Sequence, residues 1–187
     1  MKYLSLVILL LTSFAAGARE LPWLQLFAMV REVKSGDVFR AVDHRRVVHL
    51  VRLSGCDAPE LGQTGGKEAR RELRELILDK QVRIRHRYVD ARGRTLGQVY
   101  VGKTWVNRAM IASGLAWHYD PYDEFPALQE VEAHARRNDS GLWSQERPIP
   151  PWWWRRGKIR PFPQMEEKMP RLFPRRPSSN QPQLISR

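Results

Sequence analysis

The stretch that decides the fold of this chain is Val51-Arg52-Leu53-Ser54-Gly55-Cys56-Asp57-Ala58-Pro59-Glu60. It begins as an apolar-rich strand and then turns. Pro59 fixes its own φ and biases Ala58 toward an extended conformation, so the turn holds its carboxylates in a stiff arrangement. Two acids three residues apart can share one cation and one activated water, and Arg52 is near enough to reach the same rim. The stretch therefore predicts a chemical site at the end of a strand.

Strand and helix patterns extend outward from this stretch on both sides. Strand-like segments are predicted at residues 26–33, 38–41, 47–53, 82–88 and 96–101. In the fourth strand, Val82 and Ile84 share the apolar face, and Tyr88 joins it beyond a one-residue shift. Apolar residues at helical spacing predict helices that open at Gly65-Gly66 and span 106–113 and 126–137. This order favours an α+β, mainly β fold, in which helices pack on a small barrel.

The N-terminus follows the three-part plan of a secretory signal peptide. Lys2 precedes a nearly unbroken apolar run at residues 4–11, and Ala16-Gly17-Ala18 provides a small-x-small cleavage signal. We therefore expect residues 1–18 to be removed and the protein to be secreted or periplasmic. The alternative is an uncleaved membrane anchor, although the run is short against the roughly 20 residues that span a bilayer. No later stretch is apolar enough, so we expect no stable membrane insertion after cleavage.

The chain is strongly basic, with a formal net charge of +12 over 187 residues. Removing the signal takes away only Lys2 and leaves +11. This balance favours a polyanionic partner, whether nucleic acid, anionic lipid or acidic polysaccharide, and charge that serves only solubility is the alternative. Residues 19–156 are expected to form one domain and to be monomeric. Residues 157–187 are basic and contain six prolines, so we expect a disordered tail that either binds phosphates or is inert.

Two further features are interpreted as structural. Cys56 is the single cysteine, so no internal disulfide can form, and we interpret it as a small buried hydrophobe in preference to a reactive thiol. The run Pro150-Pro151-Trp152-Trp153-Trp154-Arg155-Arg156 has two interpretations. Aromatic residues beside arginines can stack nucleobases, or the run can fold back and pack its tryptophans on the barrel. We favour packing.

Residues outside the central stretch complete a candidate site for phosphodiester chemistry. Asp37 lies in a turn just before a strand, and it can converge with Asp57 if that strand neighbours residues 47–53. Oxygen ligands without His or a second Cys favour calcium or magnesium over zinc. Arg94 follows another tight turn and can supply a second guanidinium beside Arg52. Such a cation and arginines would stabilise charge on phosphorus while a free carboxylate activates water. Taken singly, Asp37 is more often a hairpin residue and Arg94 is one of many arginines.

These motifs resemble those of the thermonuclease family, also called micrococcal or staphylococcal nuclease-like domains. The resemblance spans residues 26–143 and includes Val33-Lys34-Ser35-Gly36-Asp37-Val38-Phe39, residues 51–60, Gly65-Gly66-Lys67-Glu68-Ala69, Asp90-Ala91-Arg92-Gly93-Arg94-Thr95-Leu96-Gly97, Val106-Asn107, Gly114-Leu115-Ala116-Trp117 and Gly141-Leu142-Trp143. The most specific part is Arg-Leu-x-Gly-x-Asp-Ala-Pro-Glu with a later Gly-Arg. The resemblance implies a five-stranded oligonucleotide/oligosaccharide-binding (OB-fold) barrel with three helices, in agreement with the element count.

The resemblance also implies an activity and roles for particular residues. It implies a calcium-dependent nuclease that hydrolyses DNA and RNA with little sequence preference. The implied calcium ligands are Asp37, Asp57 and the carbonyl oxygen of Ala58. The implied catalytic residues are Glu60, which activates or orients water, and two phosphate contacts, Arg52 and Arg94. The residues that fall near the tyrosines flanking the family's nucleotide are Tyr119 and Tyr122.

The chain departs from the family pattern at two positions. The family often has Asp-Gly-Asp-Thr where this chain has Ser35-Gly36-Asp37-Val38. Ser35 removes an acid near the metal and Val38 removes a hydroxyl, and both changes would weaken or retune cation binding. Two alternatives follow: a non-catalytic nucleic-acid-binding barrel, and an exported protein whose tail binds an anionic surface. The retained phosphate-proximal residues favour the nuclease: Arg52, Glu60 and Arg94.

Overall fold

The structure is a computed structural model that describes residues 21–119 and 125–157. The expected signal peptide, Tyr122 and all of the expected tail except Gly157 lie outside the described residues. Within the described ranges, no helix has the length and apolar character needed to cross a bilayer.

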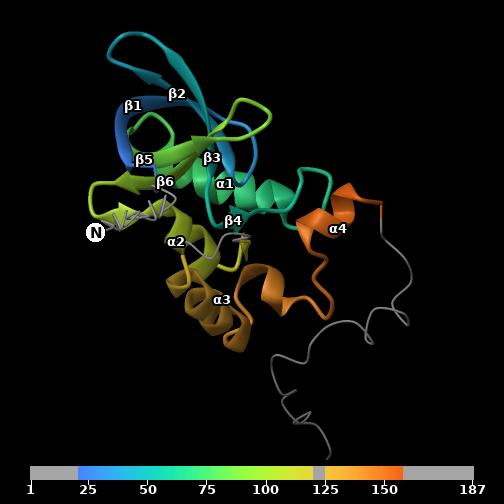
Figure 1. Ribbon diagram of the computed structural model, residues 1–187. Helices are drawn as coiled ribbons and strands as arrows, with labels where there is room; N and C mark the ends of the chain where they lie inside the picture. The colour runs from blue at the N-terminus through green and yellow to red at the C-terminus, as the bar shows by residue number, and fades with distance from the viewer. Residues whose placement is uncertain (1–20, 120–124, 158–187) are drawn as a thin grey trace, which may run out of the picture.

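Five strands close into a barrel, as the sequence predicted (Figure 1). They are β1 (Leu24–Val33), β2 (Val38–Asp43), β3 (Val48–Leu53), β5 (Gln81–Val89) and β6 (Thr95–Val101). Neighbours pair antiparallel in the order β3-β2-β1-β5-β6, and a parallel pairing of β3 with β6 closes the barrel. That closure brings the end of β3, where the central stretch turns, beside the start of β6.

Alternation of side chains along the strands fills the barrel. Apolar residues spaced two apart are buried in β2, β3 and β5, because successive side chains point to opposite faces: Phe39, Ala41, Val51, Leu53, Val82 and Ile84. In β5 the register shifts between His86 and Tyr88, which confirms the predicted one-residue shift. Beyond this bulge Tyr88 is 39% exposed, so the fully buried face does not continue to it.

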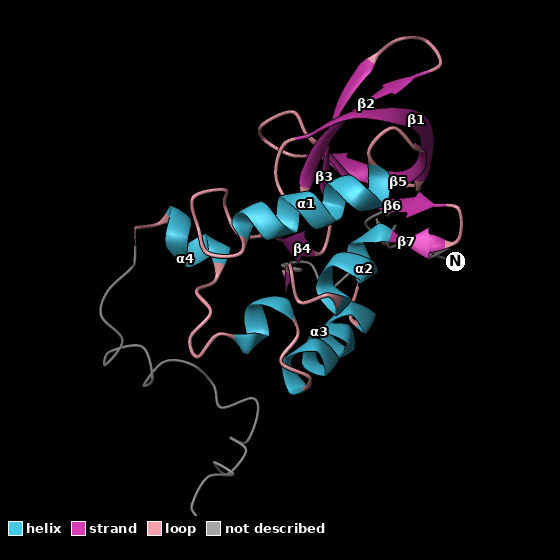
Figure 2. Ribbon diagram, turned by 180° about the vertical axis from the view of Figure 1, so that it is seen from behind, coloured by secondary structure: helices cyan, strands magenta, loops and turns pink. Residues whose placement is uncertain are grey.

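Three helices cover one end of the barrel, again as predicted: α1 (Gly66–Ile77), α2 (Val106–Ala112) and α3 (Ala127–Arg137). Helix α1 buries Ala69, Leu73 and Ile77 against the strands. It starts after Gly65, whose φ of 84° is in the left-handed region that favours glycine. Figure 2 shows α1 lying across the lower end of the barrel, with α2 and α3 below it.

Several short elements were not expected from the sequence: β4 (Cys56–Asp57), β7 (Thr104–Trp105), β8 (Trp117–His118), the 3-10 helix η1 (Gly141–Ser144) and α4 (Pro151–Arg155). Strand β4 pairs with β8, and Cys56 is buried as predicted. A second apolar cluster forms around Trp117 and Trp143, and Trp152 of α4 packs edge-on against Trp117 with a centroid distance of 5.5 Å. Trp152 therefore packs, as favoured from the sequence, but on this second cluster and not on the barrel.

Candidate active site

The turn between β1 and β2 places Asp37 by a close backbone approach. A Cβ atom on Gly36 would lie 2.5 Å from the Cβ of Ala69 and 2.7 Å from the Cβ of Ala58. Only glycine lets the turn settle against both α1 and the segment after β4. The backbone N–H of Leu53 donates to the carbonyl oxygen of Asp37 at 2.9 Å, which ties the turn to the end of β3.

Arg52 binds two carboxylates that are far apart in the sequence. Its Nε lies 3.3 Å from Oδ2 of Asp37, and its Nη2 donates to Oδ1 of Asp57 at 2.7 Å. Val38 pairs directly with Arg52 between β2 and β3. The preceding Asp37 therefore lies at the same edge of the barrel as Arg52, and this edge, where β3 ends beside the start of β6, is called the rim. The Ser35 hydroxyl donates to Oδ1 of Asp37 at 2.7 Å. The structure thus brings Asp37 and Asp57 together around one guanidinium, as the sequence suggested.

The environment of Asp37 is both buried and charged. Burial raises the pKa of Asp37 above its ordinary value, and the nearby carboxylates of Asp57 and Glu60 raise it further. The Arg52 guanidinium and the Ser35 hydroxyl act in the opposite direction. A second positive charge at this rim would therefore stabilise the ionised carboxylate.

The turn after β4 presents the remaining residues of the central stretch. Asp57 is fully buried at 0% exposure, and Ala58 is buried at 3%. The Glu60 side chain is 41% exposed, so this carboxylate can meet solvent. The backbone N–H of Glu60 donates to Oε1 of Gln63 at 3.3 Å, which helps to hold the turn. The end of β4 therefore carries a buried carboxylate, and the turn after it carries an open one.

Arg155 of α4 is the site residue that sequence reasoning missed. Its Nη2 donates to Oδ2 of Asp57 at 2.7 Å, and its Nη1 donates to Oδ1 of Asp57 and Oε1 of Glu60, both at 3.0 Å. The hydrogen bonds that Arg155 donates to Asp57 raise the pKa of Arg155, burial partly offsets this, and the hydrogen bond to Glu60 raises it further. Arg155 lies 98 residues after Asp57 and 95 residues after Glu60 in the sequence. No local pattern marks such a partner; only the arginine after three tryptophans hinted at it.

Arg94 lies in the turn between β5 and β6, where it binds a neighbour. Its Nε and Nη2 lie 2.7 Å and 2.6 Å from Oδ2 of Asp90. Burial pushes the pKa of Asp90 upward, but hydrogen bonds from the Arg94 side chain and backbone outweigh it and lower the pKa. Arg52 pairs with Leu96 across the parallel β3–β6 closure, two residues from Arg94. Arg94 therefore belongs to the same rim, with its guanidinium turned to Asp90.

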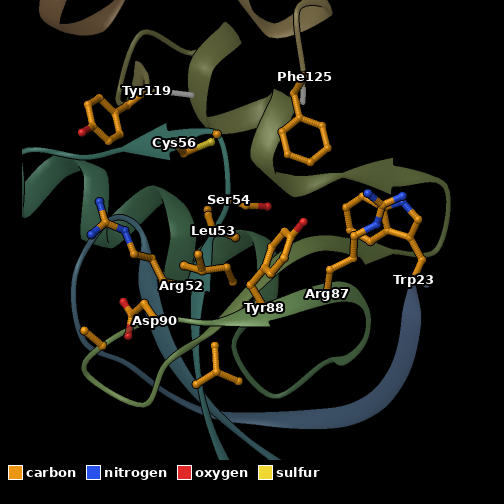
Figure 3. Close-up of a pocket in the computed structure, with 14 residues that line it drawn as sticks. Trp23, Arg52, Leu53, Ser54, Cys56, Arg87, Tyr88, Asp90, Tyr119 and Phe125 are labelled. Atoms are coloured by element: carbon orange, nitrogen blue, oxygen red, sulfur yellow. The ribbon is translucent and has the colours of Figure 1, made fainter. Parts of the chain in front are cut away.

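A cavity of about 630 Å³ opens beside Arg52 (Figure 3). Figure 3 shows Arg52 and Asp90 on one side, Trp23 and Arg87 on the other, and Tyr88 between them. Its lining also includes Phe125 and the expected substrate residue Tyr119. Aromatic rings and guanidinium groups together suit flat bases joined by phosphates.

Asn107 holds the end of β3 in place from inside α2. Its Nδ2 donates to the carbonyl oxygens of Ser54 at 2.8 Å and Gly97 at 3.0 Å, and its Oδ1 accepts from the N–H of Val99 at 2.9 Å. Asn107 is fully buried. No structural role was predicted for Asn107 from the sequence, although an amide among the apolar residues of a short helix is a usable signal.

The acidic residues fit a hard cation by their chemistry. Within residues 21–119 and 125–157, no group of three or more His, Cys, Asp or Glu side chains is placed to hold a metal ion as it stands. Asp37 and Asp57 nevertheless offer buried carboxylate oxygens that already bind guanidinium nitrogens, and Ala58 offers a nearby backbone carbonyl. Arg155 bridges Asp57 and Glu60.

A closed OB-fold barrel with arginines and carboxylates gathered at one rim is the architecture of a nuclease domain of the staphylococcal type. The sequence model described as "Staphylococcal nuclease homologue" matches residues 50–145, about half of the chain. The chain therefore belongs to the staphylococcal nuclease homologue family, as the resemblance predicted. Two residues of the rim lie outside the matched range, Asp37 and Arg155.

Individual relatives agree with this assignment. An uncharacterized endonuclease of Escherichia coli O157:H7 is 38% identical over 130 residues, covering 69% of this chain and 84% of that protein. A micrococcal nuclease of Shigella flexneri is 37% identical over 145 residues, covering 72% and 83%. A staphylococcal-like nuclease of Arabidopsis thaliana is 39% identical over 108 residues. The match covers 58% of this chain and only 33% of that plant protein, so the chain spans about a third of its length.

Proposed function

We propose that this protein is an exported, calcium-dependent nuclease that hydrolyses the phosphodiester bonds of DNA and RNA with low sequence specificity. Membership of a nuclease family supports the reaction class. The observation that carries the proposal is the position of Arg52, whose guanidinium lies between the carboxylates of Asp37 and Asp57. Phosphodiester cleavage needs fixed positive charge beside oxygen ligands, and this rim supplies both.

The arginines of the rim would hold the scissile phosphate. Arg52 uses Nε and Nη2 on the two aspartates, which fixes the plane of its guanidinium and leaves Nη1 outside these contacts. A planar guanidinium fixed in this way can grip a phosphate oxygen with little loss of side-chain entropy. Arg94 would supply the second guanidinium after turning from Asp90. The aromatic lining of the adjacent cavity would stack the bases next to the cleaved bond.

Glu60 is the residue we assign to the attacking water. Its carboxylate is attached to the same stiff turn as Asp57, yet its side chain is 41% exposed. It can therefore accept a proton from a water molecule near the phosphate. The buried Asp57 is less accessible to such a water molecule. The residues that would hold calcium are Asp37, Asp57 and the carbonyl oxygen of Ala58. When bound, the cation would polarise the phosphate and stabilise the charge that develops on its oxygens.

The assay is cleavage of plasmid DNA and of RNA by the mature protein, with calcium or with a chelator. We expect cleavage with calcium, loss of cleavage with chelator, and a fall of at least about 100-fold for Glu60→Gln, the range typical of a lost general base. Glu75→Gln is the matched control, because Glu75 is exposed on α1 and the charge change is the same.

Three results would contradict parts of this proposal. A wild-type protein that binds nucleic acid but cleaves neither substrate with any divalent cation would be a binding barrel. Cleavage that persists in chelator would exclude the metal requirement. Full activity of Glu60→Gln would place the water-activating group elsewhere.

Export and the monomeric state are proposed on the sequence alone. We propose that residues 1–18 are cleaved and that the mature protein acts in a periplasm or outside the cell. The test is expression of the full chain in a bacterial host, followed by cell fractionation and sequencing of the N-terminus. A mature N-terminus at Arg19 supports cleavage, and an intact Met1 in the membrane fraction would contradict it. Light scattering of the mature protein tests the monomer.

A further inference from the structure

The segment of residues 149–155, here the C-terminal segment, is fastened to the wall of the candidate active site. Gln63 Nε2, from a buried side chain just after Glu60, donates to the carbonyl oxygen of Ile149. Trp152 packs against Trp117 at 5.5 Å and against Tyr119 at 5.3 Å between ring centroids. Figures 1 and 2 both show α4 beside the loop that leads from β4 into α1.

This fastening delivers Arg155 to the oxygens of the site. Two of its nitrogens bind both oxygens of Asp57, and Nη1 also reaches Oε1 of Glu60. A bidentate guanidinium–carboxylate pair is among the stronger charge-assisted contacts. Asp57 is fully buried, so its carboxylate needs a positive partner at all times. In this arrangement Arg155 is one of the two guanidiniums that meet the need.

A divalent cation would use the same oxygens. Asp57 has few lone pairs that are not already directed at Arg52 or Arg155, because both of its oxygens accept from guanidinium nitrogens. Glu60 cannot orient a water freely while its Oε1 binds Nη1 of Arg155. Binding of a cation, and work by Glu60, therefore both require Arg155 to leave. Its side chain is 33% exposed, so a path into solvent is open.

We propose that Arg155 is a built-in competitor for the divalent cation, and that the C-terminal segment restrains this nuclease until the cation displaces the guanidinium. This inference rests on the proposed function, since it assigns a regulator to the same carboxylates. The arrangement supplies positive charge to a buried carboxylate in the absence of metal, and it sets a threshold cation concentration for activity. Cation affinity then depends on how often the segment opens.

The test is isothermal titration calorimetry of the full mature chain with calcium chloride and no nucleic acid. Arg155→Gln should lower the calcium Kd about tenfold, the factor expected if the closed arrangement holds about 90% of the calcium-free molecules. Trp152→Ala, which loosens the segment without touching a carboxylate, should lower the Kd in the same direction. Arg156→Gln is the matched control, because it removes an exposed arginine one residue further on and should leave the Kd unchanged.

The outcomes separate this proposal from the proposed function. Equal calcium Kd values for wild type and Arg155→Gln would overturn the competitor role. The role would also be overturned if neither protein bound calcium. A fall in cleavage by Arg155→Gln at saturating calcium without a gain in affinity would also overturn it, and would place Arg155 on the substrate. A protein that binds calcium as expected but cleaves nothing would end the proposed activity while leaving the competition between Arg155 and calcium intact.

Discussion

Gly36 and Ala58 approach so closely that a Cβ atom on Gly36 would lie 2.7 Å from the Cβ of Ala58. This approach positions Asp37 at the rim, so Gly36→Ala should harm both stability and activity. We expect a loss of about 1–3 kcal/mol from overpacking. We also expect cleavage to fall at least about tenfold, because small displacements of site residues are costly. Urea unfolding and the plasmid assay measure the two effects.

The control for this prediction is Gly62→Ala. A Cβ atom there would meet a single neighbour, Cζ2 of Trp154, at an ordinary 4.0 Å. Unchanged stability in Gly36→Ala would show that the turn can move away from Ala58 without strain.

Asn107 should be one of the most sensitive positions in the fold. Asn107→Ala removes one donor from the carbonyl oxygens of Ser54 and Gly97, and it removes the acceptor of the buried Val99 N–H in β6. We expect a loss of about 1–3 kcal/mol in the free energy of unfolding, because the buried Val99 N–H would keep its desolvation cost. Asn138→Ala, at an exposed helix end, should cost much less. Similar losses for the two variants would contradict the role of Asn107.

Much of the fold follows from local signals. Alternating burial in β2 and β3, the glycine at the start of α1 and the shift before Tyr88 each act over a few residues, so sequence patterns reveal them. The pairing of β2 with β3 likewise allowed the meeting of Asp37 and Asp57 to be expected. The short strands β4 and β8 escaped notice because each has only two residues and exists only through its partner.

The missed parts of the site depend on contacts across the whole chain. Arg155 is 95 residues from Glu60, and nothing near Arg155 indicates which carboxylate it meets. Arg94 shows the reverse case, because its family position is clear while its guanidinium is turned to Asp90. The direction of a charged side chain at the rim depends on which oppositely charged side chains the fold places near it. Local sequence patterns therefore indicate candidate members of the site more readily than they indicate which side chains pair with one another.

The pairing of Asp90 with Arg94 predicts a pH-dependent contribution to stability. Since the pKa of Asp90 is lowered in the fold, its ionised form is stabilised. The contribution should be present above the unfolded pKa of about 3.9 and be lost as pH falls through the folded pKa. Asp90→Asn should thus be less stable than wild type near pH 7, by less than about 1 kcal/mol because the pair is near the surface. If the stability difference between wild type and Asp90→Asn did not shrink toward pH 2, the ionised Asp90 carboxylate would not be its cause.

Trp23 should contribute to substrate binding rather than to the chemical step. It lines the cavity opposite Arg52, and the Arg87 guanidinium lies 4.4 Å from its ring centroid. Stacking on one aromatic ring is worth about 1–3 kcal/mol per base, so Trp23→Ala should weaken binding of single-stranded DNA about 5- to 160-fold. Phe27→Ala is the control, since Phe27 is 53% exposed outside this cavity. Fluorescence anisotropy in calcium-free buffer measures binding. Equal losses of DNA affinity in Trp23→Ala and Phe27→Ala would exclude a specific stacking role for Trp23.

Ser35 is the position where the chain departs from the family's acidic turn, and Ser35→Asp should restore cation affinity at the expense of the cation-free fold. The Ser35 hydroxyl now donates to Oδ1 of Asp37 at 2.7 Å. A carboxylate there removes this donor and adds a like charge beside a buried acid, which should destabilise the calcium-free protein by about 1–4 kcal/mol. The same charge should tighten calcium binding, so calcium should raise the unfolding midpoint more in Ser35→Asp than in wild type. Ser35→Asn, which has nearly the same shape and no charge, should lack the calcium-dependent gain. If calcium raises the unfolding midpoint equally in Ser35→Asn and Ser35→Asp, the departure at Ser35 does not tune cation binding.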